Sequence, residues 1–558
     1  MIQTAPDIMN PFLNKYRLPL VLLIFSVTGL AIYSNSFNVP YQFDDMTNIL
    51  DSSAIQVQNP GLLEIINAGK HGFLKNRPIA NISLALNYYF SGNALPGYHL
   101  VNILIHILAA TFLFQFLHLT LNLQYKNSAD FRISAIAFLA ALIWLVHPVH
   151  TQSVTYIVQR MNSMASMFFI LAMLSYVNFR SIADKGMKIF WLCLCLLSAL
   201  FALGTKEIAI TLPVFLFVYE WYFFQDLDAK WLKKKSLPIC TIIILLIAIS
   251  FIYMGADPFR ALLDGYKVRD FTLVERVLTQ PRVIIFYISQ LLLPHPSRLN
   301  LDHHFIFSQG WLNPSATLYA FAGILGMIIL AIHAARKDRF LSFGIFWFLG
   351  NLVIESSIIP LEIIYEHRSY LPSMMLIPVA VIIVYRATGW DLKKILVSGL
   401  FAAVMFSLWT YQRNITWQTP LALWSDCAQK SPLKARSHNN LGKTLADKGE
   451  HLKALEHFST AIKQSAKPES QQFYNKAVSL EFLGRIDESI DYYNKALTLA
   501  PNYLAAHNNL GIAYARLNNL ELAAYHFKEA LRINPNDSPA RQNLARCNLI
   551  IHQQQLKK

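Results

Sequence analysis

Two adjacent carboxylates are the residues of this chain best suited to chemistry. Asp44 and Asp45 follow Phe43 in a polar stretch about ten residues beyond an apolar run. Neighbouring carboxylates repel each other, which raises the pKa of one of them. One could therefore act as a general base while the other orients a donor or a metal. The alternative is a solvated acidic turn of the kind common in loops.

Further ionisable residues occur near the ends of long apolar runs, where a buried charge is costly and usually functional. They stand in six motifs: Asn76-Arg77-Pro78, Gly97-Tyr98-His99, His147-Pro148-Val149-His150, the single Arg160, Lys206-Glu207 and Glu366-His367-Arg368. Taken singly, each has a structural explanation, such as a snorkelling cation, a histidine that caps a helix or a local ion pair.

The cations of these motifs are more informative as a set. They are Arg77, Arg160, Lys206 and Arg368, and we expect them on one side of the molecule around the carboxylate pair. Arginine contacts phosphate through two parallel hydrogen bonds, and lysine acts as a point charge. The set therefore predicts a site for a phosphate-bearing lipid head, beside a carboxylate that activates an acceptor.

The sequence gives weaker evidence for a metal site than for a phosphate site. His147 and His150 are three residues apart, but a proline lies between them and no third ligand is evident. The run 302–304, Asp-His-His, is an equally weak candidate. The five cysteines fit neither a zinc site nor a disulfide framework. We expect no obligatory metal and no other cofactor.

The composition shows what kind of body must position these residues. Of the 558 residues, 54% are hydrophobic and only 15% are charged, whereas soluble domains carry about 25% charge. A water-soluble enzyme, a disordered scaffold and a disulfide-stapled secreted domain are excluded. The net charge is +15, but much of it lies in short loops between apolar runs, so we predict a membrane protein that binds no nucleic acid.

Eleven apolar runs are long enough to cross a bilayer, including a retained first span. They lie near residues 18–34, 98–121, 132–148, 161–179, 188–204, 207–224, 236–255, 316–334, 340–357, 371–386 and 395–412. The run 283–293 is shorter and lies between Pro281 and Pro294, which favours a re-entrant or interfacial helix.

The charges of the short loops test this count. With the N-terminus inside, every inner loop is basic, as the positive-inside rule requires. These loops hold Lys126 and Arg132; Arg180, Lys185 and Lys188; Lys230 and Lys233–Lys235; Arg336, Lys337 and Arg339; and Arg386, Lys393 and Lys394. The long loops 35–97 and 256–315, and the region after residue 412, are then outside. Because loops on a rigid scaffold carry function, the working face is expected there.

The last quarter of the chain contains a repeat. The pattern Leu441-Gly442, Gly449, Ala454, Phe458, Ala461 recurs with offsets of 35 and then 34 residues. This period is typical of tetratricopeptide (TPR) helix–turn–helix repeats, which stack into a groove that binds peptides. We therefore predict an all-α chain with a membrane body at 1–412, a linker or helix at 413–433, three TPR repeats at 434–535, and a capping helix and tail at 536–558.

The residues resemble a known family. An aspartate pair in the first outer loop of an eleven-span body resembles the GT-C glycosyltransferases, which use polyprenyl-phosphate sugars as donors. The motifs at 76–78, 97–102, 147–151, 206–207 and 366–368, together with the domain order, resemble the TMTC-type proteins. These are transmembrane, TPR-containing protein O-mannosyltransferases related to the dolichyl-phosphate-mannose protein mannosyltransferases.

The resemblance implies an inverting transfer of a hexose such as mannose from a polyprenyl-phosphate sugar to Ser or Thr hydroxyls of proteins held by the TPR groove. Asp44 would be the general base, supported by Asp45. Arg160 matches a donor-binding arginine, and Lys206, Arg368 and Arg77 would bind the lipid phosphate. The other residues expected to line the site are His99, His147, His150, Glu207, Glu366 and His367. Asn162 stands where the family often has an acidic residue, and Asp45 where protein mannosyltransferases have Glu.

Two alternatives stay open at this stage. One is a GT-C transferase that acts on a lipid or glycan acceptor, although such an enzyme would have little use for a TPR array that captures proteins. The other is a non-catalytic, membrane-anchored TPR assembly scaffold. The compact outer loops favour a bacterial inner membrane, with the TPR repeats in the periplasm. If the source is eukaryotic, the endoplasmic reticulum membrane is expected instead.

Overall fold

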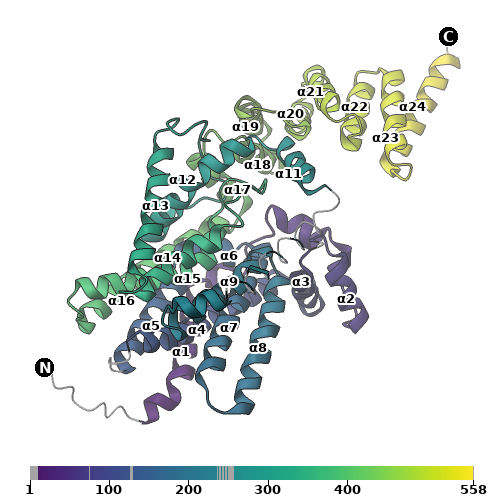
Figure 1. Ribbon diagram of the computed structural model, residues 1–558. Coiled ribbons are helices and arrows are strands. Elements are labelled where there is room, and N and C mark those ends of the chain that lie inside the picture. The colour runs from purple at the N-terminus through teal and green to yellow at the C-terminus, as the bar shows by residue number, and fades with distance from the viewer. Residues whose placement is uncertain are drawn as a thin grey trace. The chain divides into compact units, whose positions relative to one another are not determined.

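The computed structural model describes residues 11–74, 76–125, 130–235 and 257–556, with five isolated positions between 237 and 248. Within these residues all regular structure is helical (Figure 1). The predicted all-α class is therefore confirmed. Contacts divide the chain into a first unit, Met1–Leu301 with Phe305–Gln418, and a second unit, Asp302–His304 with Thr419–Lys558.

The first unit is built from long apolar helices and short polar ones. Its helices are α1 (Pro11–Ile32), α2 (Leu62–His71), α3 (Pro78–Ser91), α4 (Leu95–Gln124), α5 (Asp130–Leu145), α6 (Thr151–Val154), α7 (Arg160–Ser181), α8 (Lys185–Leu203), α9 (Leu212–Tyr219), α11 (Pro258–Lys267), α12 (Leu273–Leu292), α13 (Ala316–Ala334), α14 (Arg339–Leu352), α15 (Tyr370–Ala387) and α16 (Leu392–Trp417). Proline at the first or second position begins α3, α4 and α9, where its missing N–H costs no hydrogen bond.

Ten of the eleven predicted spans coincide with helices, and the run 236–255 lies outside the described residues. Seven described helical segments are long and apolar enough to cross a membrane, and the pair Asp130–Leu145 and Pro148–Val154 makes an eighth if it is one bent span. The apolar part of α1 and the 14-residue α14 are shorter. The chain is therefore a membrane protein by these helices, whereas the count of eleven stays a prediction.

The segment 283–293, for which the sequence favours a re-entrant or interfacial helix, belongs to a longer helix. It is the second half of α12, which has 20 residues, starts at a capping box of Thr272 and Glu275, and continues through Pro281. The upstream turns were missed because their polar residues break the apolar run. The structure buries those residues against protein: Arg276 donates to the carbonyl oxygens of Glu355 and Ser357.

The core of the first unit is a group of helices in alternating directions. Helix α4 packs against α5 and α7, α7 packs against α8, and α14 packs against α15 (Figure 1). In an alternating arrangement the starts of α4, α7 and α15 lie at the same end as the ends of α8 and α14. The motifs singled out in the sequence occupy these helix ends.

The second unit consists of consecutive helix pairs (Figure 1). After α17 (Pro420–Lys430) come α18 (Ala435–Asp447), α19 (His451–Gln464), α20 (Ser470–Phe482), α21 (Ile486–Leu499), α22 (Leu504–Arg516), α23 (Leu520–Ile533) and α24 (Ser538–Leu556). The repeated glycines permit close helix packing, since a Cβ at Gly442 or Gly511 would lie 2.7 Å from the ring of Phe458 or Phe527.

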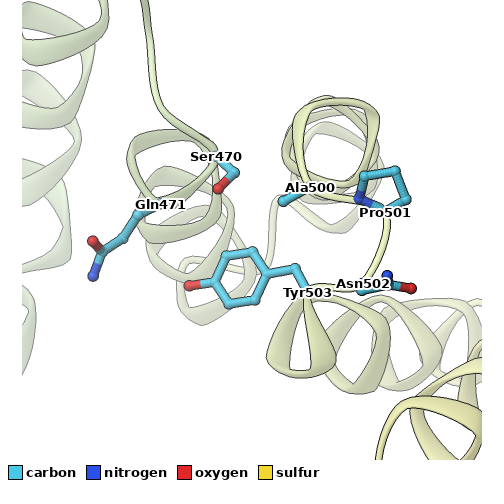
Figure 2. A pocket seen from close by; sticks show the side chains of 6 residues that line it. All are labelled: Ser470, Gln471, Ala500, Pro501, Asn502 and Tyr503. Carbon is cyan, nitrogen blue, oxygen red and sulfur yellow. The ribbon is translucent and has the colours of Figure 1, made fainter. Parts of the chain in front are cut away.

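Two features of the second unit bear on binding. The Asp302 carboxylate accepts hydrogen bonds from the Arg436 guanidinium and the Ser437 hydroxyl, and so joins the run 302–304 to the start of α18. A shallow hollow lies between the start of α20 and the turn before α22, where the Tyr503 side chain is flanked by Ser470 and the Ala500–Asn502 turn (Figure 2).

Candidate functional site

The aspartate pair lies on a short helical turn after α1, and its two carboxylates differ in environment. Phe43 has a positive φ of 46°, which turns the chain so that Asp44 is exposed while Asp45 is only 1% exposed. Asp45 Oδ2 accepts the backbone N–H of Gln42 at 3.0 Å, and Oδ1 accepts that of Val158 at 2.7 Å. Asp45 therefore joins this turn to the segment just before α7.

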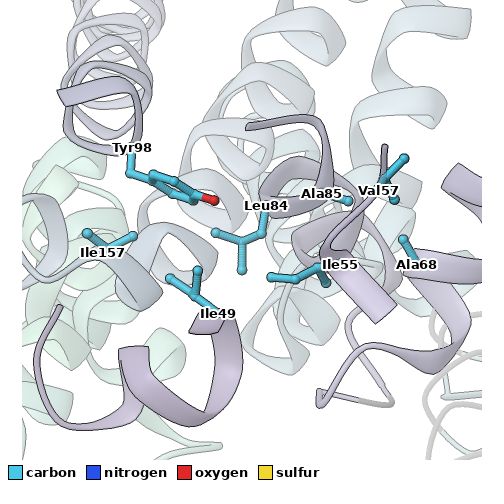
Figure 3. Close-up of a cluster of buried hydrophobic side chains, with 8 residues drawn as sticks. All are labelled: Ile49, Ile55, Val57, Ala68, Leu84, Ala85, Tyr98 and Ile157. Atoms are coloured by element: carbon cyan, nitrogen blue, oxygen red, sulfur yellow. The ribbon is translucent and has the colours of Figure 1, made fainter. Parts of the chain in front are cut away.

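A hydrophobic cluster holds the turn in place. It consists of Ile49, Ile55, Val57, Ala68, Leu84, Ala85, Tyr98 and Ile157 (Figure 3). These side chains come from the loop after α1 and from α2, α3, α4 and the segment before α7. A rigid support of this kind fixes the backbone of the pair without using its polar atoms.

Burial, together with the nearby charge of Asp44, raises the pKa of Asp45 to about 8, although the two backbone N–H groups oppose the shift. Asp45 is therefore mostly protonated at pH 7, and the pair does not carry two adjacent charges. The backbone N–H of Asp44 donates to the Tyr156 hydroxyl at 2.8 Å. Asp44 is thus a solvent-facing carboxylate, and Asp45 holds the turn on which Asp44 lies.

Arg160, predicted to bind the donor, is surrounded by acceptors of the protein. Its side chain is buried, and all of its N–H groups have acceptors in the protein. Nε donates to Asn102 Oδ1 at 2.6 Å; Nη2 donates to Asn87 Oδ1 and to the Tyr98 carbonyl; and Nη1 donates to Ser83. A guanidinium has five N–H donors, so none remains for a phosphate. Arg160 instead joins the starts of α4 and α7 to α3.

A second group of charges surrounds Lys206. Its Nζ donates to Glu355 Oε1 and to Asn162 Oδ1, both at 2.8 Å. Arg368 Nε lies 3.9 Å from the same carboxylate oxygen. All three charged side chains are buried. Burial lowers the pKa of Lys206, and Glu355 opposes this shift. The cluster therefore places two buried cations on one carboxylate.

Arg77 extends this cluster towards solvent. Its guanidinium contacts both carboxylate oxygens of Glu207 at 2.9 to 3.1 Å. Arg77 is close enough to Lys206 to lower its pKa. Three cations, Arg77, Lys206 and Arg368, thus share two carboxylates, and the excess positive charge suits an anionic ligand.

Buried polar atoms in the cluster are left unused. Among the described residues, neither Arg368 Nε nor His367 Nδ1 has a hydrogen-bond partner. The His367 ring stacks on the Tyr365 ring at 5.2 Å between centroids. The Arg368 guanidinium lies over the Tyr365 ring, 5.5 Å from its centroid. Unsatisfied buried polar atoms are costly and often mark a ligand position.

Aromatic residues connect the cluster to the aspartate turn. Tyr156 interacts electrostatically with Asp44 and with Tyr365, and Asn162 Nδ2 donates to the His367 carbonyl at 2.7 Å. The two groups of charges therefore occupy neighbouring parts of one end of the bundle.

The remaining residues predicted to line the site make hydrogen bonds with protein groups. His99 Nε2 lies 2.9 Å from the Val39 carbonyl oxygen, His147 Nε2 lies 3.0 Å from that of Leu291, and His150 contacts Trp144 and Ser373. Glu366 accepts the backbone N–H of Asn300 at 2.6 Å. The place of these residues in the motifs predicts that they line the site, but that place does not reveal which way a side chain points. Among the described residues, no group of three or more His, Cys, Asp or Glu could hold a metal ion.

Sequence reasoning missed Glu355, Tyr156 and Tyr365. Glu355 lies at the end of an apolar run, and a single carboxylate there does not by itself indicate a site. A charge beside an apolar run is nevertheless costly, so Glu355 could have been considered as a partner for Lys206. Tyrosines near helix ends are common and carry no signal by themselves.

Comparisons with known proteins agree with this architecture. A family model of the tetratricopeptide repeat matches residues 470–536, which contain α20 to α23. Protein O-mannosyl-transferase F38B6.6 of Caenorhabditis elegans is 25% identical over 472 residues, covering 79% of this chain and 62% of that protein. Protein O-mannosyl-transferase TMTC3 of Mus musculus is 26% identical over 591 residues, covering 92% of this chain and 60% of that protein.

The chain is thus similar to protein O-mannosyl-transferases over most of its length, and spans about 60% of the length of these curated relatives. Among solved structures, the crystal structure of the APC/C hetero-tetramer Cut9-Hcn1 matches with a TM-score of 0.24 and 15% identity, covering 85% of this chain and 89% of that chain. That score is too low to carry an argument.

Proposed function

We propose that this protein is a membrane glycosyltransferase that transfers a hexose, such as mannose, from a polyprenyl-phosphate donor to Ser or Thr hydroxyls of proteins. One observation carries the proposal: an exposed, positioned carboxylate, Asp44, lies at the same end of the bundle as a cationic cluster with unused buried donors. The names of the relatives support a protein acceptor and mannose.

The reaction is a single displacement. Asp44 removes the proton of the acceptor hydroxyl while its oxygen attacks the anomeric carbon of the sugar. The bond from that carbon to the phosphate oxygen breaks, polyprenyl phosphate leaves with the electron pair, and the anomeric configuration inverts. The proton stays on Asp44 until it is lost to water.

The cationic cluster stabilises the leaving group. Lys206 and Arg368 are held by Glu355, so their charges are fixed before the donor arrives. Preorganised cations are more effective in a dry site than in water, because they need no reorganisation during the reaction. Arg368 Nε and the His367 ring supply donors that protein groups leave unused.

Asp45 and Arg160 act by positioning. Asp45 fixes the turn that carries Asp44 through its bonds to Gln42 and Val158. Arg160 fixes the start of α7, two residues before Asn162, which orients Lys206. The TPR repeats increase the local concentration of acceptor proteins, and we place them with the site on the outer or lumenal face.

The test is transfer by membranes that contain the full chain, measured by mass spectrometry of a Ser/Thr peptide acceptor with a polyprenyl-phosphate hexose donor. Asp44→Asn keeps the shape and removes the base, so turnover should fall about 10²–10⁴-fold. The matched control is Asp51→Asn, an exposed aspartate of the same loop. Turnover of Asp44→Asn close to that of the wild type would refute the assignment.

A further inference from the structure

A cavity lies at the opposite end of the first unit from the candidate site. It has a volume of 220 Å³ and is lined by Leu121, Ile133, Ile136 and Ile382, with Arg132, Tyr125, Tyr385 and Trp390 completing it. These residues come from the end of α4, the start of α5, the end of α15 and the turn after α15. Helix α4 alone separates Tyr98, beneath the aspartate turn, from Leu121 by roughly 35 Å at 1.5 Å per residue.

This end of the bundle is the one that the positive-inside pattern assigns to the cytoplasm, since Arg132 and Arg386 belong to the basic inner loops. The two arginines are used differently. Arg386 is bound by the Asp338 carboxylate and donates to the Tyr125 hydroxyl at 2.7 Å. Arg132 is exposed and makes no hydrogen bond or ion pair with any described residue. Its charge is therefore available at the edge of the cavity.

An aromatic frame surrounds the opening. The Trp390 ring contacts Tyr385 at 5.2 Å and Tyr125 at 6.1 Å between centroids, and Arg386 lies over it at 5.6 Å. Gly389 and Trp390 both have positive φ, 72° and 61°, and this conformation is unfavourable for Trp. The chain thus accepts local strain to hold an indole that is still 47% exposed. Trp and Tyr at the ends of membrane spans are typical of the bilayer interface.

We propose that this cavity binds an anionic glycerophospholipid of the cytoplasmic leaflet. The headgroup phosphate contacts Arg132, the glycerol region packs on Trp390, and one acyl chain enters between Ile133 and Ile382. Pockets that enclose a whole ligand have volumes of about 300–1,000 Å³, and this cavity is smaller. Only one end of the occupant can therefore enter it, as one acyl chain of a lipid does. Anionic lipids give the cytoplasmic leaflet its negative charge, and basic pockets between spans recognise their heads.

A polyprenyl phosphate shares the phosphate and the apolar tail, but it does not fit this position as well. Its phosphate must reach the cationic cluster around Lys206 and Arg368, which lies with Asp44 at the other end of the bundle. The two lipids can be separated experimentally because they differ in tail and headgroup.

The experiment is a titration of the purified full chain with single lipids, followed by native mass spectrometry. The lipids are dioleoyl phosphatidylglycerol, dioleoyl phosphatidylcholine and a polyprenyl phosphate. Phosphatidylglycerol should bind the wild type at least about tenfold more tightly than phosphatidylcholine, as one charge-assisted contact allows. Arg132→Gln should remove that preference: phosphatidylglycerol binding should weaken about tenfold, and phosphatidylcholine binding should weaken less, because its choline cation already neutralises the phosphate. The matched control, Lys185→Gln, removes another exposed inner-loop cation away from the cavity and should have no effect.

A second measurement locates the lipid. Phosphatidylglycerol with brominated acyl chains quenches nearby tryptophans, and the part of the quenching that is lost in Trp390→Phe reports this cavity. Equal affinities for the two phospholipids, equal losses in Arg132→Gln and Lys185→Gln, or unchanged quenching in Trp390→Phe would each overturn the proposal. Arg132-dependent binding of polyprenyl phosphate that is tighter than that of phosphatidylglycerol would also overturn it, by identifying a different lipid.

Discussion

The buried carboxyl of Asp45 should make the stability of the aspartate turn depend on pH. Its pKa is about 8 in the folded protein against an ordinary value of 3.8, so the folded state binds this proton more tightly than the unfolded state. The contribution to stability is fully present below about pH 4 and is lost as the pH rises towards 8. Each pH unit inside this window costs about 1.4 kcal/mol. Between pH 5 and pH 7 the loss is therefore about 3 kcal/mol.

Asp45→Asn removes this titration. The amide can accept only one of the two backbone N–H groups that Asp45 binds, those of Gln42 and Val158, and the other is left facing a donor. That change costs about 1–3 kcal/mol at every pH. The variant should therefore lose stability by a constant amount, while the pH-dependent loss disappears.

Hydrogen exchange followed by mass spectrometry measures this locally. The readout is the protection factor of the amides of Gln42 and Val158, which corrects for the dependence of intrinsic exchange on pH. In the wild type it should fall about 100-fold between pH 5 and pH 7, since 1.36 kcal/mol is a factor of ten. In Asp45→Asn it should be nearly constant, and Asp51→Asn should follow the wild type. Parallel profiles for the wild type and Asp45→Asn would refute the reasoning.

Three other outcomes are expected. Glu355→Gln should lower stability by about 3–5 kcal/mol, because it leaves the buried charges of Lys206 and Arg368 without a carboxylate. Lys206→Met should cost less, because Arg368 still lies 3.9 Å from Glu355. The double variant should cost less than the sum in a thermal-melting cycle, and additivity would contradict the ion pair. The Nδ1 atoms of His507 and His526 lie 3.0 Å apart, and burial, with His507 nearby, lowers the pKa of His526 to about 4. The unfolded state therefore binds protons first, and stability should be lost as the pH falls from about 6.5 to 4. The double variant His507→Phe with His526→Tyr, which copies the stacked pair of the second repeat, should reduce this loss, and the remainder belongs to the equivalent His438–His457 pair of the first repeat. An unchanged acid profile by circular dichroism would argue against it. Removal of residues 434–558 should spare transfer to a short peptide and abolish transfer to whole proteins, and an equal loss on both acceptors would place the repeats in the active site.

The fold class followed from local patterns. The helical period of apolar residues, the run lengths and the 34- to 35-residue repeat are properties of neighbouring positions, so they could be interpreted without knowing the packing. Helix α12 shows the limit of this approach, because its first turns are polar and are helical only through capping and burial against other segments.

The sequence also identified most of the charged residues at the working end, because a charge beside an apolar run is rare and costly. It could not assign their partners. Lys206 has Glu207 as its neighbour in sequence, yet it pairs with Glu355, 149 residues away, while Glu207 pairs with Arg77. Ion pairing depends on which helix ends meet, and alternating helices bring together ends that are far apart in the chain.

Tertiary structure alone decided which residues can meet a ligand. Arg160 and Arg368 are both buried arginines in motifs of the same kind, but Asn87, Asn102, Ser83 and the Tyr98 carbonyl occupy the donors of Arg160, whereas Arg368 keeps an unused Nε. Asp44 and Asp45 are identical in type and adjacent in sequence, and a single backbone turn exposes one and buries the other. Burial and hydrogen-bond partners are set by the packing of distant segments, so identical residues acquire different chemistry only in the folded protein.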